Sequence, residues 1–374
     1  MSEASKTKLK RVYFENLDAL RFLAAFSVLV FHYFREVNGY FQGISQNALF
    51  QKYLGLTDKG RLGVNFFFVL SGFLITNLIL NEQHQKGKFN VLRFFQRRIL
   101  RIWPLYFIIG FIGFILFPLI LEGFSSSHNI VYYSLFLTNF NEISLGGNDP
   151  ANFLTSPWSV AVEEQFYLFW GVIFLLIFNI GKKYLPYLIL VMYLGAFAFR
   201  YAFWEDEKVI YYHTISVFQD ILTGAFIGWS LFEGKKWLEK IKTIPKLGVI
   251  LIYILGFGFC LGKNIIFKGE LVVFERFVLS LFFGFIILDQ IRGDHSLIKL
   301  GKIKPFNYLG KISYGLYMYH LVVFFLLNIL FEAQGWFINM HVFTYFILGV
   351  SGTIILAGLS YRFIEAPLLK LKRH

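Results

Sequence analysis

An arginine and a histidine lie in one apolar segment near the N-terminus, NLDALRFLAAFSVLVFHYF (residues 16–34). Ten residues separate Arg21 from His32, and eleven helical steps of about 100° return the chain to within about 20° of the same face. Charged groups are costly in hydrocarbon, so this face must contact protein or water. A histidine there is suited to general-base catalysis. The alternative is an arginine that reaches to the membrane surface and a structural histidine.

Four arginines occur together in the segment RFFQRRILRIWPLYF. Arg93, Arg97 and Arg101 recur every four residues, which places them along one helical face, and Arg98 lies beside them. Guanidinium groups bind phosphate with two parallel hydrogen bonds, whereas lysine offers only a point charge. The pattern favours a phosphate-binding site formed by Arg97, Arg98 and Arg101. The alternative is the ordinary excess of cytoplasmic positive charge in membrane proteins.

Two adjacent acids open another apolar segment, SPWSVAVEEQFYLFW (residues 156–170). Ser159 and Glu163 fall on one helical face, and Glu164 points about 100° away from it. We therefore expect Glu163 to have the inward role, at the depth of His32, with Glu164 and Tyr167 as supporting groups. The alternative is a pair of acids at the membrane interface.

Two further segments carry polar side chains at helical spacing. In GKISYGLYMYH, the side chains of Ser313, Tyr317 and His320 share a face, which we place in the cytoplasmic half of a span. In RLGVNFFFVLSGFLI, Ser71 and Gly72 permit close contact between helices. Packing explains both patterns as well as chemistry does, so these residues are candidates for substrate contacts or for support.

The elements that position these residues are membrane spans. The chain of 374 residues is 56% hydrophobic and 20% aromatic, with only 16% charged residues. A span needs about 20 mostly apolar residues, and such segments favour helices because lipid satisfies no backbone polar groups. The sequence predicts an all-α polytopic membrane protein with ten transmembrane helices, at about residues 17–35, 61–81, 103–121, 158–180, 184–203, 209–232, 245–262, 270–291, 313–331 and 341–363. The single cysteine, Cys260, offers neither a disulfide nor a metal cluster.

The distribution of basic residues predicts the orientation of the bundle. With the N-terminus inside, 25 of the 36 Lys and Arg residues lie in cytoplasmic segments and 7 in outer loops. This bias places both termini in the cytoplasm. The segment 122–157 contains no Lys or Arg and is expected to face outward, where it could act as a lid. The stretch 129–140 within it is too short to span.

Taken together, these motifs resemble the membrane acyltransferase-3 family. The family pairs a basic residue with a histidine eleven positions later, as Arg21 and His32 do, and carries an R-x-x-R matched by Arg98 and Arg101. GVNFFFVLSGFLI, WSVAVEEQFY and ISYGLYMYH are similar to its other motifs, in the same order. Two positions depart from the pattern, because Asn65 replaces an aspartate and Met318 a leucine.

The resemblance implies a bacterial inner-membrane O-acyltransferase. Such an enzyme moves an acyl group, usually acetyl, from cytoplasmic acyl-CoA to a carbohydrate hydroxyl, such as one on lipopolysaccharide or exopolysaccharide. Residues 1–374 would form one domain, without the outer hydrolase-like domain of some relatives. Membrane lipids would surround it, and we expect no metal and no nucleic acid as partners.

The residues then take roles in this chemistry. The arginines, with Arg21, would hold the phosphates of CoA. His32 would deprotonate the acceptor or transiently carry the acyl group, and Glu163 would orient or stabilise His32 if their spans meet. The alternative from another class is a proton-coupled transporter that exports a glycan or an anionic small molecule, since intramembrane Arg, His and Glu also suit a proton relay. Against it, the chain shows no paired broken helices.

Overall fold

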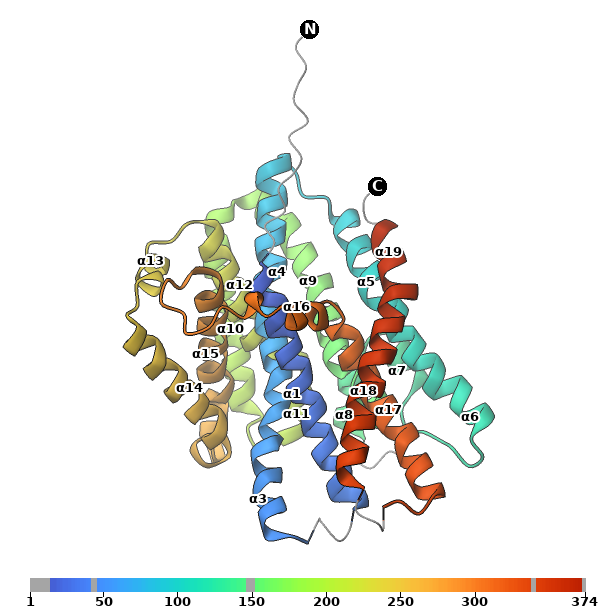
Figure 1. The fold of residues 1–374 in the computed structure, drawn as a ribbon. Helices are drawn as coiled ribbons and strands as arrows, with labels where there is room; N and C mark the ends of the chain where they lie inside the picture. Colours follow the sequence, from blue (N-terminus) through green and yellow to red (C-terminus); the bar gives the residue numbers. More distant parts are fainter. Residues whose placement is uncertain (1–13, 42–45, 146–151, 338–340, 372–374) are drawn as a thin grey trace.

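The computed structural model describes residues 14–41, 46–145, 152–337 and 341–371. These residues form helices and no strands. Ten helical segments among them are long and apolar enough to cross a membrane, which confirms the predicted spans. α1 begins and α19 ends toward the same end of the bundle, at the top of Figure 1.

The ten spans are built on the long helices α1 (Glu15–Tyr40), α4 (Leu62–Lys86), α5 (Val91–Phe111), α9 (Trp158–Ile180), α10 (Leu185–Ala202), α12 (Thr214–Phe232), α14 (Lys246–Ile266), α15 (Val272–Arg292), α17 (Ser313–Ala333) and α18 (Val342–Ser360). The shorter helices are α3 (Ala48–Thr57), α6 (Phe117–Ile120), α7 (Ile130–Ser134), α8 (Thr138–Ser144), α11 (Glu207–Tyr212), α13 (Trp237–Lys242), α16 (Lys304–Lys311) and α19 (Ala366–Lys370).

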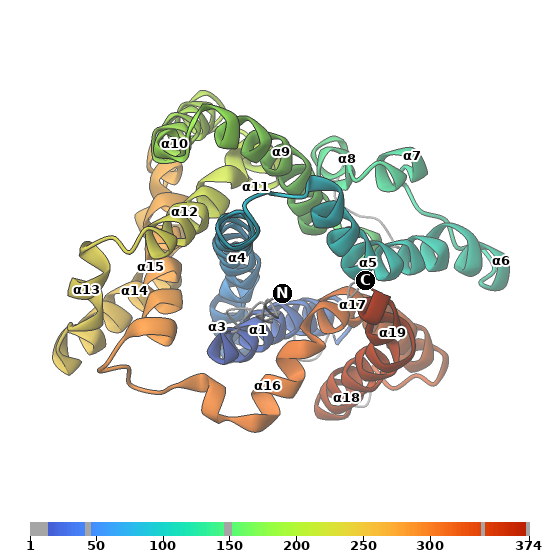
Figure 2. The same cartoon turned by 90° about the horizontal axis from the view of Figure 1, so that it is seen from above.

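In Figure 2, α4 lies inside the bundle with α1 and α17 beside it; other long helices form an arc around them, and the short helix α16 covers the remaining side of α1. The apolar part of α4 is the most buried of the ten spans, whereas α10, α14 and α18 are the least buried. Peripheral helices can present their apolar side chains to lipid, while an interior helix can carry polar groups shielded from it. The candidate residues on α1, α4 and α17 therefore lie where protein surrounds them.

The backbones of α4 and α12 lie in direct contact where the two helices cross, because a glycine stands at the crossing point on each helix. A Cβ added at Gly72 would lie 1.9 Å from the carbonyl oxygen of Ile221, and one at Gly224 would lie 1.8 Å from that of Val69. Both distances are far below van der Waals contact, so only glycine fits at either position. The expected close contact at Gly72 is confirmed, and α12 supplies its partner.

The segment between α5 and α9 is partly exposed, and Tyr133, Thr138 and Asn139 are among the residues in it that are buried. Residues 129–140 form parts of α7 and α8 instead of one span, and they break at Phe136, which has a positive φ of 55°. The side-chain amide of Gln165 donates to the carbonyl oxygen of Phe136 at 2.7 Å. Residues 146–151 of the predicted lid lie outside the described residues, so a lid function stays a prediction.

Candidate active site

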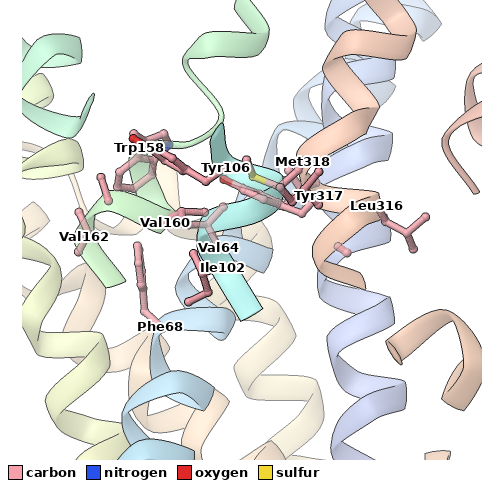
Figure 3. Close-up of a cluster of buried hydrophobic side chains, with 14 of the residues drawn as sticks. Val64, Phe68, Ile102, Tyr106, Trp158, Val160, Val162, Leu316, Tyr317 and Met318 are labelled. Carbon is pink, nitrogen blue, oxygen red and sulfur yellow. The ribbon is translucent and has the colours of Figure 1, made fainter. Parts of the chain in front are cut away.

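A hydrophobic cluster brings the helices of the site together. Phe68 from α4, Ile102 from α5, Val160 from α9 and Leu316 from α17 are all buried in it (Figure 3). Each is within three residues of a candidate polar group on the same helix, so packing of the apolar side chains fixes where the polar ones point.

The polar candidates converge on one cavity of about 110 Å³, which we call the arginine cavity. Five helices wall it, namely α1, α4, α5, α9 and α17. Its polar lining consists of Arg21, Ser71, Arg98, Arg101, Ser159, Glu163, Tyr167, Ser313, Tyr314 and Tyr317. The sequence had pointed to nine of these ten, all except Tyr314, in segments almost 300 residues apart.

Three guanidinium groups face this cavity. Arg21 donates to the carboxylate of Asp18 at 2.5 Å, one turn earlier on α1. Arg98 lies over the rings of Phe94 and Tyr167, 5.9 and 5.7 Å from their centres. Neither Arg98 nor Arg101 forms an ion pair with a carboxylate among the described residues, and the buried Nε of Arg98 has no hydrogen-bond acceptor there. Two cationic groups are thus available to an anionic ligand.

Arg97 lies apart from the other three. Its guanidinium donates to Glu82 of α4 at 2.5 Å, and Lys86 approaches the other oxygen of that carboxylate at 3.2 Å. Arg97 does not line the arginine cavity. The structure therefore assembles three of the four predicted phosphate-binding arginines and gives the fourth an acidic partner of its own.

The two adjacent acids on α9 point in different directions, as their spacing predicts. Glu163 lines the arginine cavity and accepts from the hydroxyl of Tyr167 at 2.8 Å. The same hydroxyl contacts the hydroxyl of Ser71. Glu164 faces away, where it accepts from the indole nitrogen of Trp103 at 3.1 Å. Glu163 is thus held in the cavity by a neighbour one turn along α9.

Ser159 and Tyr317 meet at the cavity wall nearest to the histidines. Their hydroxyl oxygens lie 2.7 Å apart, and Tyr317 donates to the carbonyl oxygen of Ser156 at 2.9 Å. These bonds tie the start of α9 to α17. His320 follows Tyr317 by one turn, with 5.9 Å between the two ring centres.

His32 and His320 form a pair just beyond that wall. Nδ1 of His320 lies 2.6 Å from the carbonyl oxygen of Tyr317, which only an N–H can satisfy. Its Nε2 is therefore the acceptor, and it lies 3.0 Å from Nδ1 of His32. The Nδ1–H of His32 also lies 3.0 Å from the carbonyl oxygen of Val28. Nε2 of His32 forms no hydrogen bond within the described ranges, and its lone pair is available as a general base requires.

This pairing differs from the expected arrangement. His320 is the partner of His32, while Glu163 bonds to Tyr167 and shares its cavity with the arginines. His320 was expected in the cytoplasmic half of its span and His32 at the depth of Glu163, and the structure brings the two histidine rings to within 4.8 Å of each other. Counting residues from the end of a span gives only an approximate depth in the membrane, because each helix is tilted and shifted along the membrane normal by a different amount.

Asn65, one of the two positions that depart from the motifs of the resemblance, has a carboxylate beside it. Its side-chain amide donates to Asp220 of α12 at 2.9 Å, and Asp220 also pairs with Arg276 of α15. A neighbouring helix thus supplies a carboxylate next to position 65. Sequence reasoning overlooked Asp220, and it overlooked Asp18, although its spacing of three residues from Arg21 was a usable signal.

Comparison with known proteins agrees with the motifs. A family model described as "Acyltransferase domain" matches residues 14–362. The protein named "Putative O-acetyltransferase SACOL0978" from Staphylococcus aureus strain COL is 30% identical over 389 aligned residues, covering 97% of this chain and 59% of that protein. "O-acetyltransferase OatA" of S. aureus strain NCTC 8325 is 27% identical, covering 96% of this chain and 57% of its own length. No solved structure matches the chain.

The chain thus spans somewhat over half the length of these relatives, and the match reaches almost every residue that the structure describes. The ten apolar helices found within the described ranges make it a multi-pass membrane protein. The protein belongs to the family defined by this membrane acyltransferase domain.

Proposed function

We propose that the protein is an integral membrane O-acyltransferase of the bacterial inner membrane. It moves an acetyl group from cytoplasmic acetyl-CoA to a hydroxyl of an extracytoplasmic or lipid-linked carbohydrate. The observation that carries the proposal is the convergence of Arg21, Arg98 and Arg101 with Glu163 in one cavity. O-acetyltransferases among the similar proteins support the same reaction class.

The donor fits the chemistry of the arginine cavity. Acyl-CoA carries several phosphates, and no acid among the residues that the structure describes forms an ion pair with Arg98 or Arg101. Bidentate bonds from guanidinium groups would hold those phosphates. The cavity walls also include Phe67, Leu70 and Leu74, which suit the slim, mainly apolar arm that ends in the thioester. The phosphates would remain at the arginines while the acyl group reaches the far wall.

The histidine pair supplies the base. Nε2 of His32 would take the proton of the acceptor hydroxyl as its oxygen bonds to the acyl carbonyl carbon. The bond from that carbon to sulfur then breaks, and the proton passes from His32 to the CoA thiolate. His320 holds His32 in the required tautomer. Attack by Nε2 itself, to form a transient acyl-histidine, uses the same lone pair.

The donor assignment is tested by removing charge at Arg98 and Arg101. We expect Arg98→Gln and Arg101→Gln each to raise KM for acetyl-CoA about tenfold or more, because a hydrogen bond to a charged group contributes about 1.5–3 kcal/mol. KM for the acceptor should remain near the wild-type value. Initial rates of labelled acetyl transfer by the purified protein give both constants.

The matched control is Arg93→Gln, which removes an exposed guanidinium from the same helix outside the cavity. It should leave both constants unchanged. If the two cavity variants altered only the KM of the acceptor, the arginines would serve the other substrate and the donor assignment would fail.

A further inference from the structure

A second cavity, larger and more polar than the first, lies beside the start of α4. Its volume is about 590 Å³, and its walls come from η1 (Asp58–Arg61) and the start of α4, the end of α10, α11, the end of α14 and the start of α15. These ends lie in the lower part of Figure 1, between its left side and its centre, whereas α1 begins and α19 ends toward the top. Asn65 lines this cavity, and Phe67 and Phe68, two and three residues later, line the arginine cavity.

The floor of the second cavity carries an excess of buried positive charge. Lys263 pairs with Glu275 at 2.8 Å, and Arg276 pairs with Asp220. Arg200 is 1% exposed and forms no ion pair with any described residue. Its hydrogen bonds go to neutral acceptors, including the hydroxyl of Ser216 at 2.8 Å. A buried charge without a counterion is costly, so an anion bound in this cavity would be stabilised.

Two more cations reach the cavity from its rim. Arg61 lies over the ring of Tyr211, 5.4 Å from its centre, and its nearest acid is Asp58 at 3.7 Å. The buried Nε of Arg61 has no acceptor among the described residues. Lys268 is exposed and, unlike Arg61, forms no ion pair in the described part of the chain. Glu205 and Glu207 line the rim as well, but both are exposed to solvent, which screens them.

Aromatic side chains complete the lining and connect it to the reaction site. Trp204, Tyr211 and Phe267 line the cavity, and aromatic faces can pack against the C–H faces of sugars while polar groups beside them bond to hydroxyls. Tyr211 packs on Trp158 with ring centres 5.1 Å apart, and Trp158 packs on Phe68 of the arginine cavity at 5.8 Å. One layer of rings thus separates the two cavities.

We propose that the second cavity binds the acceptor through a sugar unit that carries an oxyanion, either a carboxylate or a phosphate. The assignment rests on the proposed function, because it makes the bound saccharide the acceptor of the acyl group. It adds a substrate class, namely an anionic saccharide held by Arg61, Lys268 and Arg200 against an aromatic wall.

Binding is measured on the purified full chain without acyl-CoA, using fluorescence of the tryptophans, one of which lines the cavity. The probes are trigalacturonic acid, glucose 1-phosphate, neutral maltotriose and glycerol 1-phosphate. At least one anionic sugar should bind about tenfold or more tightly than maltotriose, and added salt should weaken its binding. Equal binding of maltotriose would overturn the proposal. If glycerol 1-phosphate bound as well as the sugars, the cavity would be a lipid-headgroup site, which also overturns it.

Two rim variants avoid the folding risk of replacing buried Arg200. Arg61→Gln should raise the Kd of the anionic sugar about tenfold, and Lys268→Gln about two- to fivefold, since it is exposed. The matched control, Lys52→Gln, changes an exposed lysine of α3 that does not line the cavity and should leave Kd unchanged. Unchanged Kd in both rim variants would contradict the site.

Transfer assays separate this inference from the proposed function. With acetyl-CoA as donor, Arg61→Gln should raise KM for the anionic acceptor and leave KM for acetyl-CoA unchanged. Normal binding of the anionic sugar without any acetyl transfer to it would defeat the acceptor role and the proposed function together. If wild type and Arg61→Gln both transferred acetyl to neutral acceptors as well as to the anionic one, the protein would still be an O-acetyltransferase, and only the inference about the second cavity would fail.

Discussion

At the residue scale, the decisive feature is the direction of the hydrogen bonds between two histidines. His320 is fully buried and donates to a backbone oxygen, so it offers only an acceptor to His32. That acceptor fixes the proton of His32 on Nδ1 and leaves Nε2 for chemistry. His320 is thus a positioning residue, and His32 is the candidate base.

Replacing His320 should therefore reduce turnover and leave donor binding intact. We expect His320→Leu to lower kcat about tenfold or more, because the Nδ1–H of His32 keeps only its bond to Val28. His320→Gln, whose amide oxygen can accept that bond, should recover most of the rate. KM for acetyl-CoA should not change in either variant. His32→Ala, by contrast, removes the base itself and should lower kcat about a hundredfold or more.

Steady-state rates at equal membrane levels of protein decide this prediction. A structural role for His320 would affect folded yield and would not distinguish Gln from Leu in kcat. If Gln and Leu lowered kcat equally while the protein remained folded, the acceptor role of His320 would be refuted.

At the element scale, the contact between α4 and α12 positions both cavities. Ser71 faces the arginine cavity one residue before Gly72, and Asp220 reaches Asn65 from α12. We expect Gly224→Ala to destabilise the protein by about 1–3 kcal/mol or more, because the added methyl group would overlap the backbone of Val69. Thermal unfolding in detergent should show a lower Tm.

Gly195→Ala is the control for the glycine contact, since no atom lies within 4 Å of the position where its Cβ would be. This helical glycine in α10 should tolerate alanine with no loss of Tm. If both variants unfolded at the wild-type temperature, the backbones of α4 and α12 would not be as close as the structure shows.

The helices illustrate what sequence could and could not predict. Hydrophobic length predicted all ten spans, and the 100° step separated Glu163 from Glu164 correctly, because both are properties of one helix. The partners of Arg97 and His32 lie on other helices and were missed, since Glu82 and His320 can be assigned only once the helices are packed. The second cavity was missed for the same reason, as its walls come from three separate stretches of the chain, residues 61–65, 200–211 and 263–276.

At the scale of the whole molecule, the positions of the two cavities and of the basic residues indicate the direction in which the acetyl group is transferred across the membrane. The arginine cavity contains Arg21 of α1 and Arg98 of α5, and the segments before these helices carry much of the positive charge predicted to be cytoplasmic. The second cavity lies at the start of α4, which runs antiparallel to α1. We therefore predict that the donor enters from the cytoplasm and the acceptor from outside.

Sealed vesicles of known protein orientation test this prediction. Acetyl-CoA is supplied only on the side of Arg98, and a membrane-impermeant acceptor is placed on one side at a time. The phosphates of CoA cannot cross hydrocarbon, so the donor stays on the side where it is added. Because the second cavity is predicted to open on the other side, product should form when the acceptor is on the side opposite to acetyl-CoA. Lys268→Gln should weaken that reaction, whereas Lys88→Gln, an exposed change in the segment before α5, should not. Product formed only with both substrates on one side would refute transfer across the membrane, even if His32 proved essential.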